Sequence, residues 1–484
     1  MLHYFQTWSC MSKLPDIVKN FPEWYQDVIY QAELADQAPV RGCIVIRPYG
    51  NALWEEIKTI LDKKIKDTGH QNALFPVLIP LSFIEKEAEH IAGFAPELAI
   101  VTHAGGKKLE EPLVVRPTSE TMIHHMFAKW IKSYRDLPLK INQWANVMRW
   151  EKRPRAFLRT SEFFWQEGHT AHETEQEALQ ETLLMLSEYV DLAENYLAIP
   201  VIRGRKSESE QFPGAQATYT FEAFMLDGKA LQMGTSHLLS QNFAKSFDMK
   251  FQNKDGQMAY PYLTSWGATT RLVGAIIASH GDQQGLIIPP RVAPIQVVII
   301  PIYKSDEQQA LVLLKARELA EKLNAAGIRT KCDDNDQMKP GAKFFAWELR
   351  GIPLRVEIGP RDLENNVALV ASRLGGDKQS VSLASLVHEI ATMLDTIQHV
   401  LYQRAEQRYQ TMWNKIEKLA DFGKKLEEQA GIYQVGWCKD AACEQLLKPY
   451  TGSIRCILED RHEMKLCFGC EKPSLVDVIA AKSY

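Results

Sequence analysis

The order of strand-like and helix-like segments changes near residue 293, and this change constrains the fold more than any other feature of the sequence. In 113–282, short strand-like runs surround one strong helical pattern at 173–197. Many strands with few helices, and no regular alternation of the two, indicate an α+β domain built on an antiparallel sheet. After residue 293 strands and helices alternate, so we expect a compact α/β domain at 293–398.

The α+β part has strand-like runs at 113–115, 141–147, 163–168, 219–224 and 230–239. A long amphipathic helix precedes them, with Asn51 as its predicted N-cap and Gly69 at its end. The apolar run 74–79 follows this helix. Because the run contains Pro76, it predicts a strand at a sheet edge or at a bulge.

The α/β part has predicted strands at 295–300, 354–358 and 367–372. Ser305 and Gln308 have the spacing of a capping box, which begins a helix that ends at Gly327. A charged helical stretch at 385–430 then leads into a cysteine-rich tail.

Length and composition limit the classes of protein that fit. The 484 residues exceed a single domain, which usually takes roughly 100 to 200 residues. The apolar runs are shorter than the roughly 18 residues that a membrane helix needs, and residues 1–10 lack the cationic start and apolar run of a signal peptide, so a cytoplasmic protein is expected. Met11 is an equally good start. The net charge of −4 excludes a globally basic nucleic-acid binder but leaves room for a local basic patch.

Four of the eight cysteines lie near the end of the chain in two closely spaced pairs, Cys438 with Cys443 and Cys467 with Cys470. Such pairs are typical of a structural Cys₄ zinc site, in which four thiolates leave no position open for substrate. Free buried thiols are the alternative, and the spacing favours zinc. Cys456 lies in an apolar run and is interpreted as a buried strand residue.

The densest positive charge lies in 149–159, where five basic side chains accompany Glu151. On charge alone, a solvated loop is slightly the better interpretation. The alternative is a site for phosphate and a planar base, because arginines alternate there with aromatic residues. Arginine binds phosphate with two parallel hydrogen bonds and stacks on bases.

Three further polar segments are weak signals on their own. At 116–121, Thr118 or Ser119 could simply cap a helix, or Thr118 and Glu120 could hold a substrate amine. The segments 232–237 and 267–271 are each more typical of a tight turn than of a site.

Taken in order, the segments resemble the signature motifs of class II aminoacyl-tRNA synthetases. The helix and strand that end at Pro76 resemble motif 1, Arg149-Trp150-Glu151 with Arg159 resembles motif 2, and 267–271 resembles motif 3. The segments 116–121, 163–169 and 281–291 narrow the resemblance to prolyl-tRNA synthetases of the archaeal and eukaryote-like type. The resemblance extends from about Pro15 to Tyr484. Motif 3 has one glycine before Arg271, a departure from the general class II pattern that the prolyl enzymes share.

The resemblance implies a domain order and an activity. It implies a class II catalytic domain at 12–290, an anticodon-binding domain at 293–398 and a small zinc-binding α/β domain at 399–484. The implied enzyme activates L-proline with ATP and Mg²⁺ to prolyl-adenylate, and transfers the prolyl group to the 3′ end of tRNA(Pro). Preoriented cations, rather than a nucleophilic side chain, are the expected catalysts. Motif 1 implies a homodimer.

The resemblance also implies roles for single residues. The expected catalytic residues are Arg149 and Arg271. The expected proline-binding residues are Thr118, Glu120, Arg149, Trp165, Glu167 and His237. The expected ATP-binding residues are Arg149, Glu151, Arg159, Thr160, Gln232, Thr235, Thr269 and Arg271. Without the family, Trp165 and His237 would be interpreted as core residues.

In the segment that resembles the anticodon-binding domain, the candidates for contact with bases are Lys343, Glu348, Arg350 and Arg355. The alternative for Arg355 is a cross-strand ion pair with Glu357. At the end of the chain, Tyr484 is expected either to fold back toward the active site, as in the resembling enzymes, or to fray.

Between His169 and Gly267 the sequence has no room for a further domain, so we expect no editing domain in this chain. Two other functions remain open at this stage. One is a sibling class II synthetase of the threonyl or glycyl type, and the other is a non-catalytic synthetase-like protein that binds tRNA. Arg149, Glu151 and Arg271 argue against the second, because a binding module does not need ligands for a triphosphate.

Overall fold

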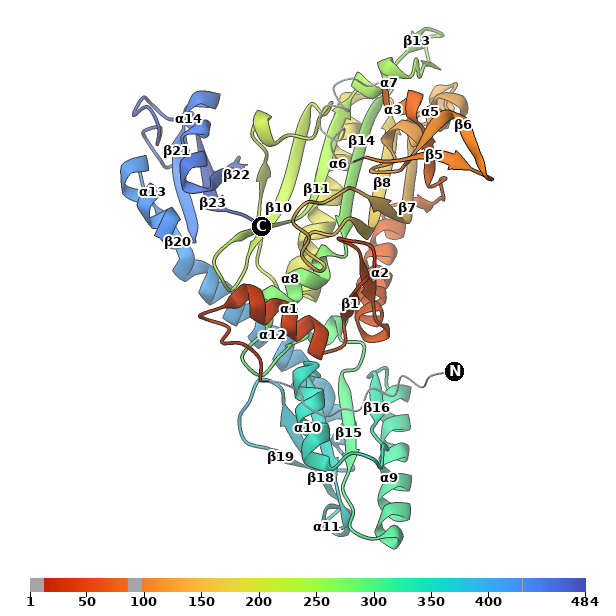
Figure 1. Cartoon of the computed structure of the whole chain (residues 1–484), viewed down its shortest axis with the longest axis vertical. Coiled ribbons are helices and arrows are strands. Elements are labelled where there is room, and N and C mark those ends of the chain that lie inside the picture. Colours follow the sequence, from red (N-terminus) through yellow and green to blue (C-terminus); the bar gives the residue numbers. More distant parts are fainter. Residues whose placement is uncertain (1–12, 86–97, 429) are drawn as a thin grey trace. The chain divides into compact units, whose positions relative to one another are not determined.

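The computed structural model describes residues 13–85, 98–428 and 430–484 (Figure 1). The alternative start at Met11 lies outside the described residues. The chain divides into two compact units. One contains 45–56 and 276–401 together with the segment that ends at Asp36, and the other contains 37–44, 57–275 and 402–484. No helix of the described part is long and apolar enough to cross a bilayer.

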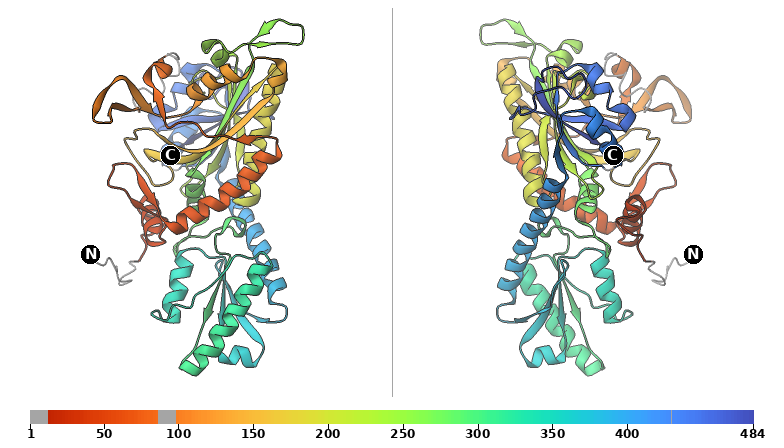
Figure 2. Two further views of the ribbon diagram at one scale, coloured as in Figure 1. Left: turned by 90° about the vertical axis from the view of Figure 1, so that its right-hand side faces the viewer. Right: turned by 90° about the vertical axis from the view of Figure 1, so that its left-hand side faces the viewer.

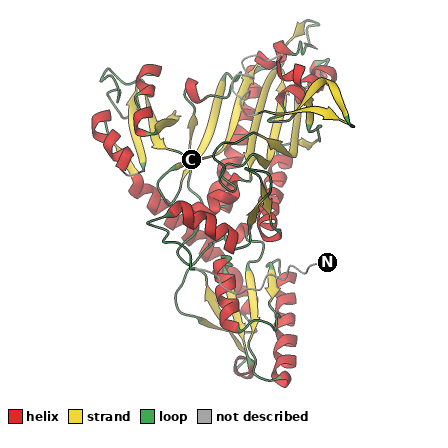
Figure 3. Ribbon diagram, viewed as in Figure 1, coloured by secondary structure: helices red, strands yellow, loops and turns green. Residues whose placement is uncertain are grey.

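An 11-stranded sheet forms the centre of the second unit, and Figure 3 shows its strands in yellow. All neighbouring strands are antiparallel except the outer pairs β20/β21 and β3/β7. In spatial order the strands are β20 (Trp413–Lys415), β21 (Ile432–Trp437), β23 (Val476–Lys482), β22 (Gly452–Leu458), β9 (Ile202–Arg205), β10 (Ala217–Phe224), β11 (Ala230–Ser240), β14 (Tyr262–Thr269), β8 (Glu162–His172), β7 (Leu139–Met148) and β3 (Gln71–Asn72). The predicted antiparallel α+β architecture is confirmed.

The C-terminal strands are continuous with this sheet. Strand β22 pairs with β9, where Ile457 lies opposite Arg205, and the side chain of Arg205 forms an ion pair of 3.4 Å with Glu459. Segments more than 200 residues apart in sequence therefore share one sheet. No sequence pattern near Arg205 or Ile457 indicates this junction.

One face of the sheet is covered by helix α6 (Glu175–Asp191), which stands against the strands in both views of Figure 2. Thr174 caps the helix by accepting the backbone N–H of Glu177 at 3.2 Å, in a capping box. On β8, Gln166 points toward this helix, because it accepts a hydrogen bond of 2.5 Å from Tyr189. Successive strand residues alternate between faces, so Trp165 and Glu167 point to the opposite face.

A buried polar cluster lies on the α6 side of the sheet. It includes His172, whose Nε2 is 2.7 Å from the hydroxyl of Thr170, and Glu181, which forms an ion pair with Lys140. Burial is the main cause that lowers the pKa of His172 to about 4, with Lys140 acting in the same direction and Glu181 against it. The neutral ring is therefore the folded form at neutral pH.

This cluster predicts how stability depends on pH. Between about pH 6.5 and 4, His172 is protonated in the unfolded chain but stays neutral in the folded chain. The free energy of unfolding therefore falls by about 3 kcal/mol as the pH falls through this window. His237, with a pKa lowered to about 4, adds a loss of the same sign. The variant H172Q should lose less of its melting temperature between these pH values than the wild type, and a slope equal to that of the wild type would contradict the prediction. The control is H103Q, at an exposed position.

Several boundaries differ from those predicted. Helix α2 (Pro48–Asp67) begins before Asn51, which lies inside it and donates to Glu55 at 2.9 Å, so the predicted N-cap is wrong. The helix ends before Gly69, which has a φ of +89°. The predicted strand at 74–79 is wrong over 74–77, and only β4 (Leu78–Pro80) forms. It joins β5 (Ala99–Ala104) and β6 (Lys107–Val115) in a small antiparallel sheet.

The α/β fold predicted for 293–398 is confirmed. Its five-stranded sheet has the order β16 (Thr330–Cys332), β15 (Val297–Pro301), β17 (Leu354–Ile358), β18 (Val367–Ser372), β19 (Gln379–Ser382). Its helices include α9 (Asp306–Ala325), α10 (Pro340–Leu349) and α11 (Pro360–Glu364). Ser305 caps α9 as predicted, although the side chain of Gln308 bonds the N–H of Lys304 instead of that of the cap residue.

The predicted helical stretch 385–430 is interrupted. Helix α12 (Leu386–Met412) is followed by β20, and α13 (Leu419–Glu428) begins a few residues later. The break has a clear cause, because Trp413 to Lys415 pair in parallel with β21. The remaining elements include α1 (Phe21–Gln31), β1 (Ala35–Gln37), β2 (Ile44–Ile46), α3 (Leu81–Glu85), α5 (Glu120–Trp130), α7 (Asn242–Ser246), β12 (Phe251–Gln252), β13 (Met258–Ala259), α8 (Arg271–His280) and α14 (Ala441–Gln445).

Candidate active site and metal centre

A cavity of about 510 Å³ lies in the second unit, against the face of the sheet opposite α6. All the side chains predicted to bind ATP or proline line it: Thr118, Glu120, Arg149, Glu151, Arg159, Thr160, Trp165, Glu167, Gln232, Thr235, His237, Thr269 and Arg271. They come from β8, β11, β14, the start of α5, the start of α8 and the loop 149–161. Residues that are distant in sequence thus meet in one site.

The loop 149–161 connects β7 with β8 and is folded over the cavity. Phe157 and Leu158 are buried, which the interpretation as a solvated loop did not anticipate. Arg155 and Arg159 exchange backbone hydrogen bonds of 2.6 and 2.8 Å, and Phe157 between them has a φ of +60°, a region that bulky residues rarely adopt. The fold of the loop places the carbonyl of Leu158 3.0 Å from Nε of Arg271.

Arg149 and Arg271 are held by backbone carbonyls. Arg149 donates from Nε to Pro117 at 2.9 Å, and its guanidinium lies over the ring of Trp165 at 5.7 Å. Arg271 donates from Nη1 to the carbonyl of Gln232 at 2.9 Å. Burial, followed by the charges of Arg149 and Arg159, lowers the pKa of Arg271 to about 10. So many cations in a partly enclosed space favour an anionic ligand.

Around these cations, several polar groups are fixed by their neighbours. Glu151 forms an ion pair with Arg159 and accepts the backbone N–H of Arg153 at 2.8 Å. Although burial opposes it, these hydrogen bonds and charges lower the pKa of Glu151. The hydroxyl of Thr160 donates to the carbonyl of Glu162 at 2.7 Å, and that of Thr269 accepts the N–H of Arg271 at 3.0 Å.

Two buried carboxylates, Glu120 and Glu167, also line the cavity. Glu120 accepts a hydrogen bond from the hydroxyl of Thr118. Glu167 accepts hydrogen bonds of 2.5 Å from both Ser119 and Gln143. Ser119 occupies the N-cap position of α5, but its side chain makes no capping bond, so the interpretation as a simple cap does not account for it. Two carboxylates lined by hydroxyls form a site suited to an amine.

His169 also belongs to this group and was missed as a site residue. Its Nε2 lies 3.1 Å from Glu167. Burial favours the neutral ring, but the hydrogen bond to Glu167 and the charge of Glu120 outweigh it and raise the pKa of His169. The signal that could have found His169 is its position two residues after Glu167, on the same face of β8.

His237 lies between two hydroxyls, with Thr218 3.0 Å from Nδ1 and Thr235 3.0 Å from Nε2. Burial is the main cause that lowers its pKa to about 4, and Glu120 acts against it. The ring of Phe212 packs on the imidazole, with 4.5 Å between the ring centroids. The neutral imidazole of His237 therefore forms part of the cavity wall, so His237 is more than a core residue.

Other lining residues were also missed. They are Phe157, Leu158, Phe163, the segment 210–213, Thr218, Leu231, Met233, Gly234, Ser265, Trp266, Gly267, Arg455 and Ser483. Strand alternation from Trp165 would have indicated Phe163. For Arg455 and the segment 210–213 the sequence offers no local signal, because their place depends on strand pairing between distant segments.

Tyr484 and Ser483 line the cavity. The backbone N–H of Tyr484 donates to the carbonyl of Ala230 at 3.2 Å. The guanidinium of Arg155 and the ammonium of Lys229 each lie 5.2 Å from the centroid of the tyrosine ring. The ring thus contacts the loop 149–161 from the C-terminal side.

These contacts predict the effect of a truncation. Deleting 482–484 removes the ring that packs on Arg155, so we expect the amino-acid-dependent exchange of pyrophosphate into ATP to slow by about tenfold through misplacement of the loop. The variant K482Q is the control. It removes only the ammonium of Lys482, which contacts the exposed carbonyl of Glu427, and it leaves Tyr484 in place. Unchanged exchange after the deletion would contradict the prediction.

The sulfur atoms of Cys438, Cys443, Cys467 and Cys470 all lie within 4.8 Å of one another. The distances from Cys438 to Cys443 and to Cys470 are both 3.7 Å. Four thiolates around zinc at about 2.3 Å would lie about 3.8 Å apart, so the four side chains fit this metal. Cys456 is a fully buried residue of β22, as predicted.

The four residues predicted to contact an anticodon do not share one site. Glu348 and Arg355 line a small cavity of about 20 Å³ together with Trp347 and Arg373. Lys343 is buried and donates to the carbonyl of Asp333 at 2.8 Å.

The two arginines among these candidates form ion pairs. Arg350 pairs with Glu33 and its guanidinium lies over Trp347. Arg355 pairs with Glu357 at 3.0 Å, along β17 and not across strands as the alternative had it.

Comparison with known proteins assigns the chain to a family. The model described as "tRNA synthetase class II core domain (G, H, P, S and T)" matches 103–280, "Anticodon binding domain" matches 296–393 and "Prolyl-tRNA synthetase, C-terminal" matches 419–484. The chain is 52% identical to the proline--tRNA ligase of Acetoanaerobium sticklandii, over 96% of this chain and 97% of that protein. It is 50% identical to proline--tRNA ligase 2 of Clostridioides difficile, over 96% of each chain, and 48% identical to the proline--tRNA ligase of Amoebophilus asiaticus, over 98% and 99%. The chain therefore belongs to the prolyl-tRNA synthetase family of class II aminoacyl-tRNA synthetases.

Proposed function

We propose that this chain is an ATP-dependent proline--tRNA ligase, which activates L-proline and transfers it to the 3′ end of tRNA(Pro). The observation that carries the proposal is the single cavity that joins two buried carboxylates with a group of arginines. The carboxylates suit the ammonium of an amino acid, and the arginines suit the phosphates of ATP. Membership of the family supports the same activity.

In the first step, a carboxylate oxygen of proline attacks the α-phosphorus of ATP. An O–P bond forms, and the bond to the leaving pyrophosphate breaks. Negative charge grows on the phosphoryl oxygens, and fixed cations stabilise it without reorganising. Arg149, held between the carbonyl of Pro117 and the ring of Trp165, is placed to bridge the two substrates. Arg271 is placed to hold the triphosphate.

Mg²⁺ bound to ATP would neutralise part of the phosphate charge. Its ligands are oxygen atoms, and Glu151 and Glu210 are the lining carboxylates outside the proposed proline pocket. On the other side, Glu120 and Glu167 would receive the secondary ammonium of proline. Because His237 is neutral, it would not repel this ammonium.

The discriminating experiment is exchange of labelled pyrophosphate into ATP with proline, threonine, glycine, serine or histidine as the amino acid. Exchange with proline alone supports the proposal. Exchange with another of these amino acids in preference to proline would assign a sibling synthetase. No exchange with any of them, together with binding of tRNA, would indicate the non-catalytic alternative.

Further properties are part of the proposal. The anticodon-binding match supports tRNA as the partner and a domain of this kind at 293–398, between a catalytic domain at 12–290 and a zinc-binding domain at 399–484. The segment that resembles motif 1 supports a homodimer, which sedimentation would test. Every residue from 172 to 262 is described, and β9, β10, β11 and short flanking elements account for most of that stretch after α6. We therefore propose that alanyl-tRNA(Pro) is not hydrolysed by this chain.

A further inference from the structure

We propose that Arg455, on the C-terminal strand β22, is a further nucleotide-binding residue that contacts the polyphosphate of ATP and is held in place by Glu222. This inference rests on the proposed function and adds a residue to the same site. Arg455 lines the cavity, although most of the lining residues lie within 118–271. Its side chain is 7% exposed, so the guanidinium is mostly enclosed.

Arg455 lies on the side of Arg271, because its partner Glu222 lies opposite Gln232, whose carbonyl accepts a hydrogen bond from Arg271. The positive charge of Arg455 is one of those that lower the pKa of Arg271, after burial and the charges of Arg149 and Arg159. The neighbours of His237, in the proposed proline pocket, are instead Thr218, Thr235 and Phe212. The ligand that Arg455 reaches is therefore the polyphosphate rather than the amino acid.

Glu222 fixes the orientation of Arg455. Its carboxylate, which is fully buried, accepts hydrogen bonds from Nε of Arg455 at 3.2 Å and from Nη2 at 3.0 and 3.2 Å. Nη1 donates to the hydroxyl of Ser453 at 3.0 Å. A guanidinium bound on two edges loses little further freedom when it meets a phosphate, as a preorganised anion site requires.

The buried charges leave a positive excess. Lys206, whose side chain is 1% exposed, binds the same carboxylate of Glu222 at 2.7 Å. Two cations thus share one carboxylate, and Arg271 adds a third cation nearby. Glu210 at the cavity wall also acts on Arg455, in the direction that favours its charge. A buried excess of cations is costly unless an anion joins it, and a phosphate group would be that anion.

Two β-bulges affect the directions of the Arg455 and Glu222 side chains. In β22, Ile454 lies opposite Ala480 and Cys456 opposite Ile479, so Arg455 is an extra residue of a bulge. In β11, Met233 is the extra residue of a second bulge, opposite the step from Phe221 to Glu222. Bulges are common beside active sites, where they redirect a side chain.

The second bulge also connects Glu222 with Arg271. Glu222 lies opposite Gln232 in the pairing of β10 with β11, and the carbonyl of Gln232 accepts a hydrogen bond from Arg271. The two arginines are thus bound by two residues that lie opposite each other in the pair β10/β11. Arg455 binds the carboxylate of Glu222, and Arg271 binds the carbonyl of Gln232.

The experiment compares R455Q, R455K and R205Q with the wild-type full chain in proline-dependent pyrophosphate exchange. Arg205 is the matched control, since it also joins β9 to the C-terminal segment but forms an exposed ion pair with Glu459 and does not line the cavity. We expect R455Q to raise the KM for ATP and for pyrophosphate by about tenfold and to leave the KM for proline within about twofold. R455K should recover part of the loss, and R205Q should match the wild type.

Equal changes for ATP and proline, or no change for either, would overturn the inference and leave Arg455 as a residue that only joins the two segments. If R455Q does not fold, as judged by its melting temperature, R455K carries the test, because it keeps the charge beside Glu222 and should still raise the KM for ATP selectively. Wild-type protein without proline-dependent exchange would refute the proposed function instead, so the two failures are distinguishable.

Discussion

Replacing Arg271 with glutamine is expected to slow proline-dependent exchange of pyrophosphate into ATP by about 10²–10³-fold. The guanidinium is fixed by the carbonyls of Leu158 and Gln232 before any substrate binds. The side chain is partly buried, and this burial, followed by the charges of Arg149 and Arg159, lowers its pKa to about 10. Such a preoriented cation acts on charge that develops in the transition state, so its removal should lower kcat as well as raise the KM for ATP.

The matched control for R271Q is R153Q. Arg153 lies on the loop 149–161 but is exposed and does not line the cavity. Because exchange does not involve tRNA, R153Q should exchange pyrophosphate at the wild-type rate. Loss of activity in R271Q by less than about tenfold, with an unchanged melting temperature, would contradict the role proposed for Arg271.

The parts of the site that the sequence predicts are those fixed by local order. The resemblance to a family assigned Trp165 and Glu167 to the site, and the alternation of one strand is consistent with it because it puts both on one face. Thr118 and Glu120, also assigned by resemblance, lie close together at one junction between a strand and a helix. Ordered motifs brought distant segments together through resemblance to a family, which no periodicity could do. The cysteine spacing was sufficient to predict that the four sulfur atoms lie together, because short loops define a chelate site.

The parts that could not be predicted depend on pairing between distant segments. Arg455 reaches the cavity because β22 pairs with β9, and nothing near Arg455 in the sequence indicates that partner. The interruption of the helical stretch 385–430 has the same origin, since Trp413 to Lys415 pair with β21. Lys343 is of a residue type that often contacts bases, but its ammonium donates to the carbonyl of Asp333 in the same domain. Tertiary context decided each of these against local preference.

The C-terminal segment contributes to the cavity in more than one way. Tyr484 and Arg455 line the cavity. Glu444, next to Cys443 on α14, accepts a hydrogen bond of 2.6 Å from Ser207, which precedes the lining residues 210–213. The order of the cysteine cluster should therefore affect the cavity through these contacts.

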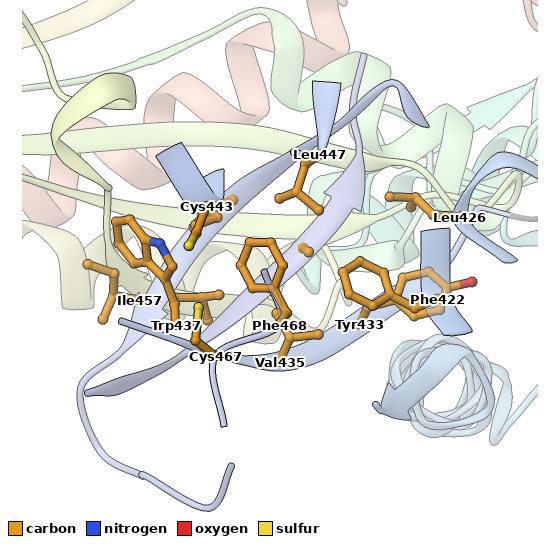
Figure 4. Close-up of a cluster of buried hydrophobic side chains, with 13 residues drawn as sticks. Phe422, Leu426, Tyr433, Val435, Trp437, Cys443, Leu447, Ile457, Cys467 and Phe468 are labelled. Carbon is orange, nitrogen blue, oxygen red and sulfur yellow. The ribbon is translucent and has the colours of Figure 1, made fainter. Parts of the chain in front are cut away.

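The second large effect is expected at the cysteine cluster. Cys443 and Cys467 are buried among Trp437, Phe468 and other apolar side chains of one core (Figure 4). We expect wild-type protein to contain about one zinc per chain, and C443S to contain almost none. Because a bound metal stabilises only the folded state, loss of several kcal/mol should lower the melting temperature of C443S by about 10 °C or more. A chelator should destabilise the wild type in the same direction.

The control for C443S is C456A, which removes a buried thiol of β22 that is not part of the cluster. It should lose some stability through the small cavity that it leaves, but keep its zinc. Metal analysis separates the two variants even if both melt earlier, since only a ligand change alters the zinc content. Wild-type protein that contains no zinc, and that a chelator does not destabilise, would leave the four cysteines as free thiols. In that case the contact of Glu444 with Ser207 would have to be maintained by apolar packing alone.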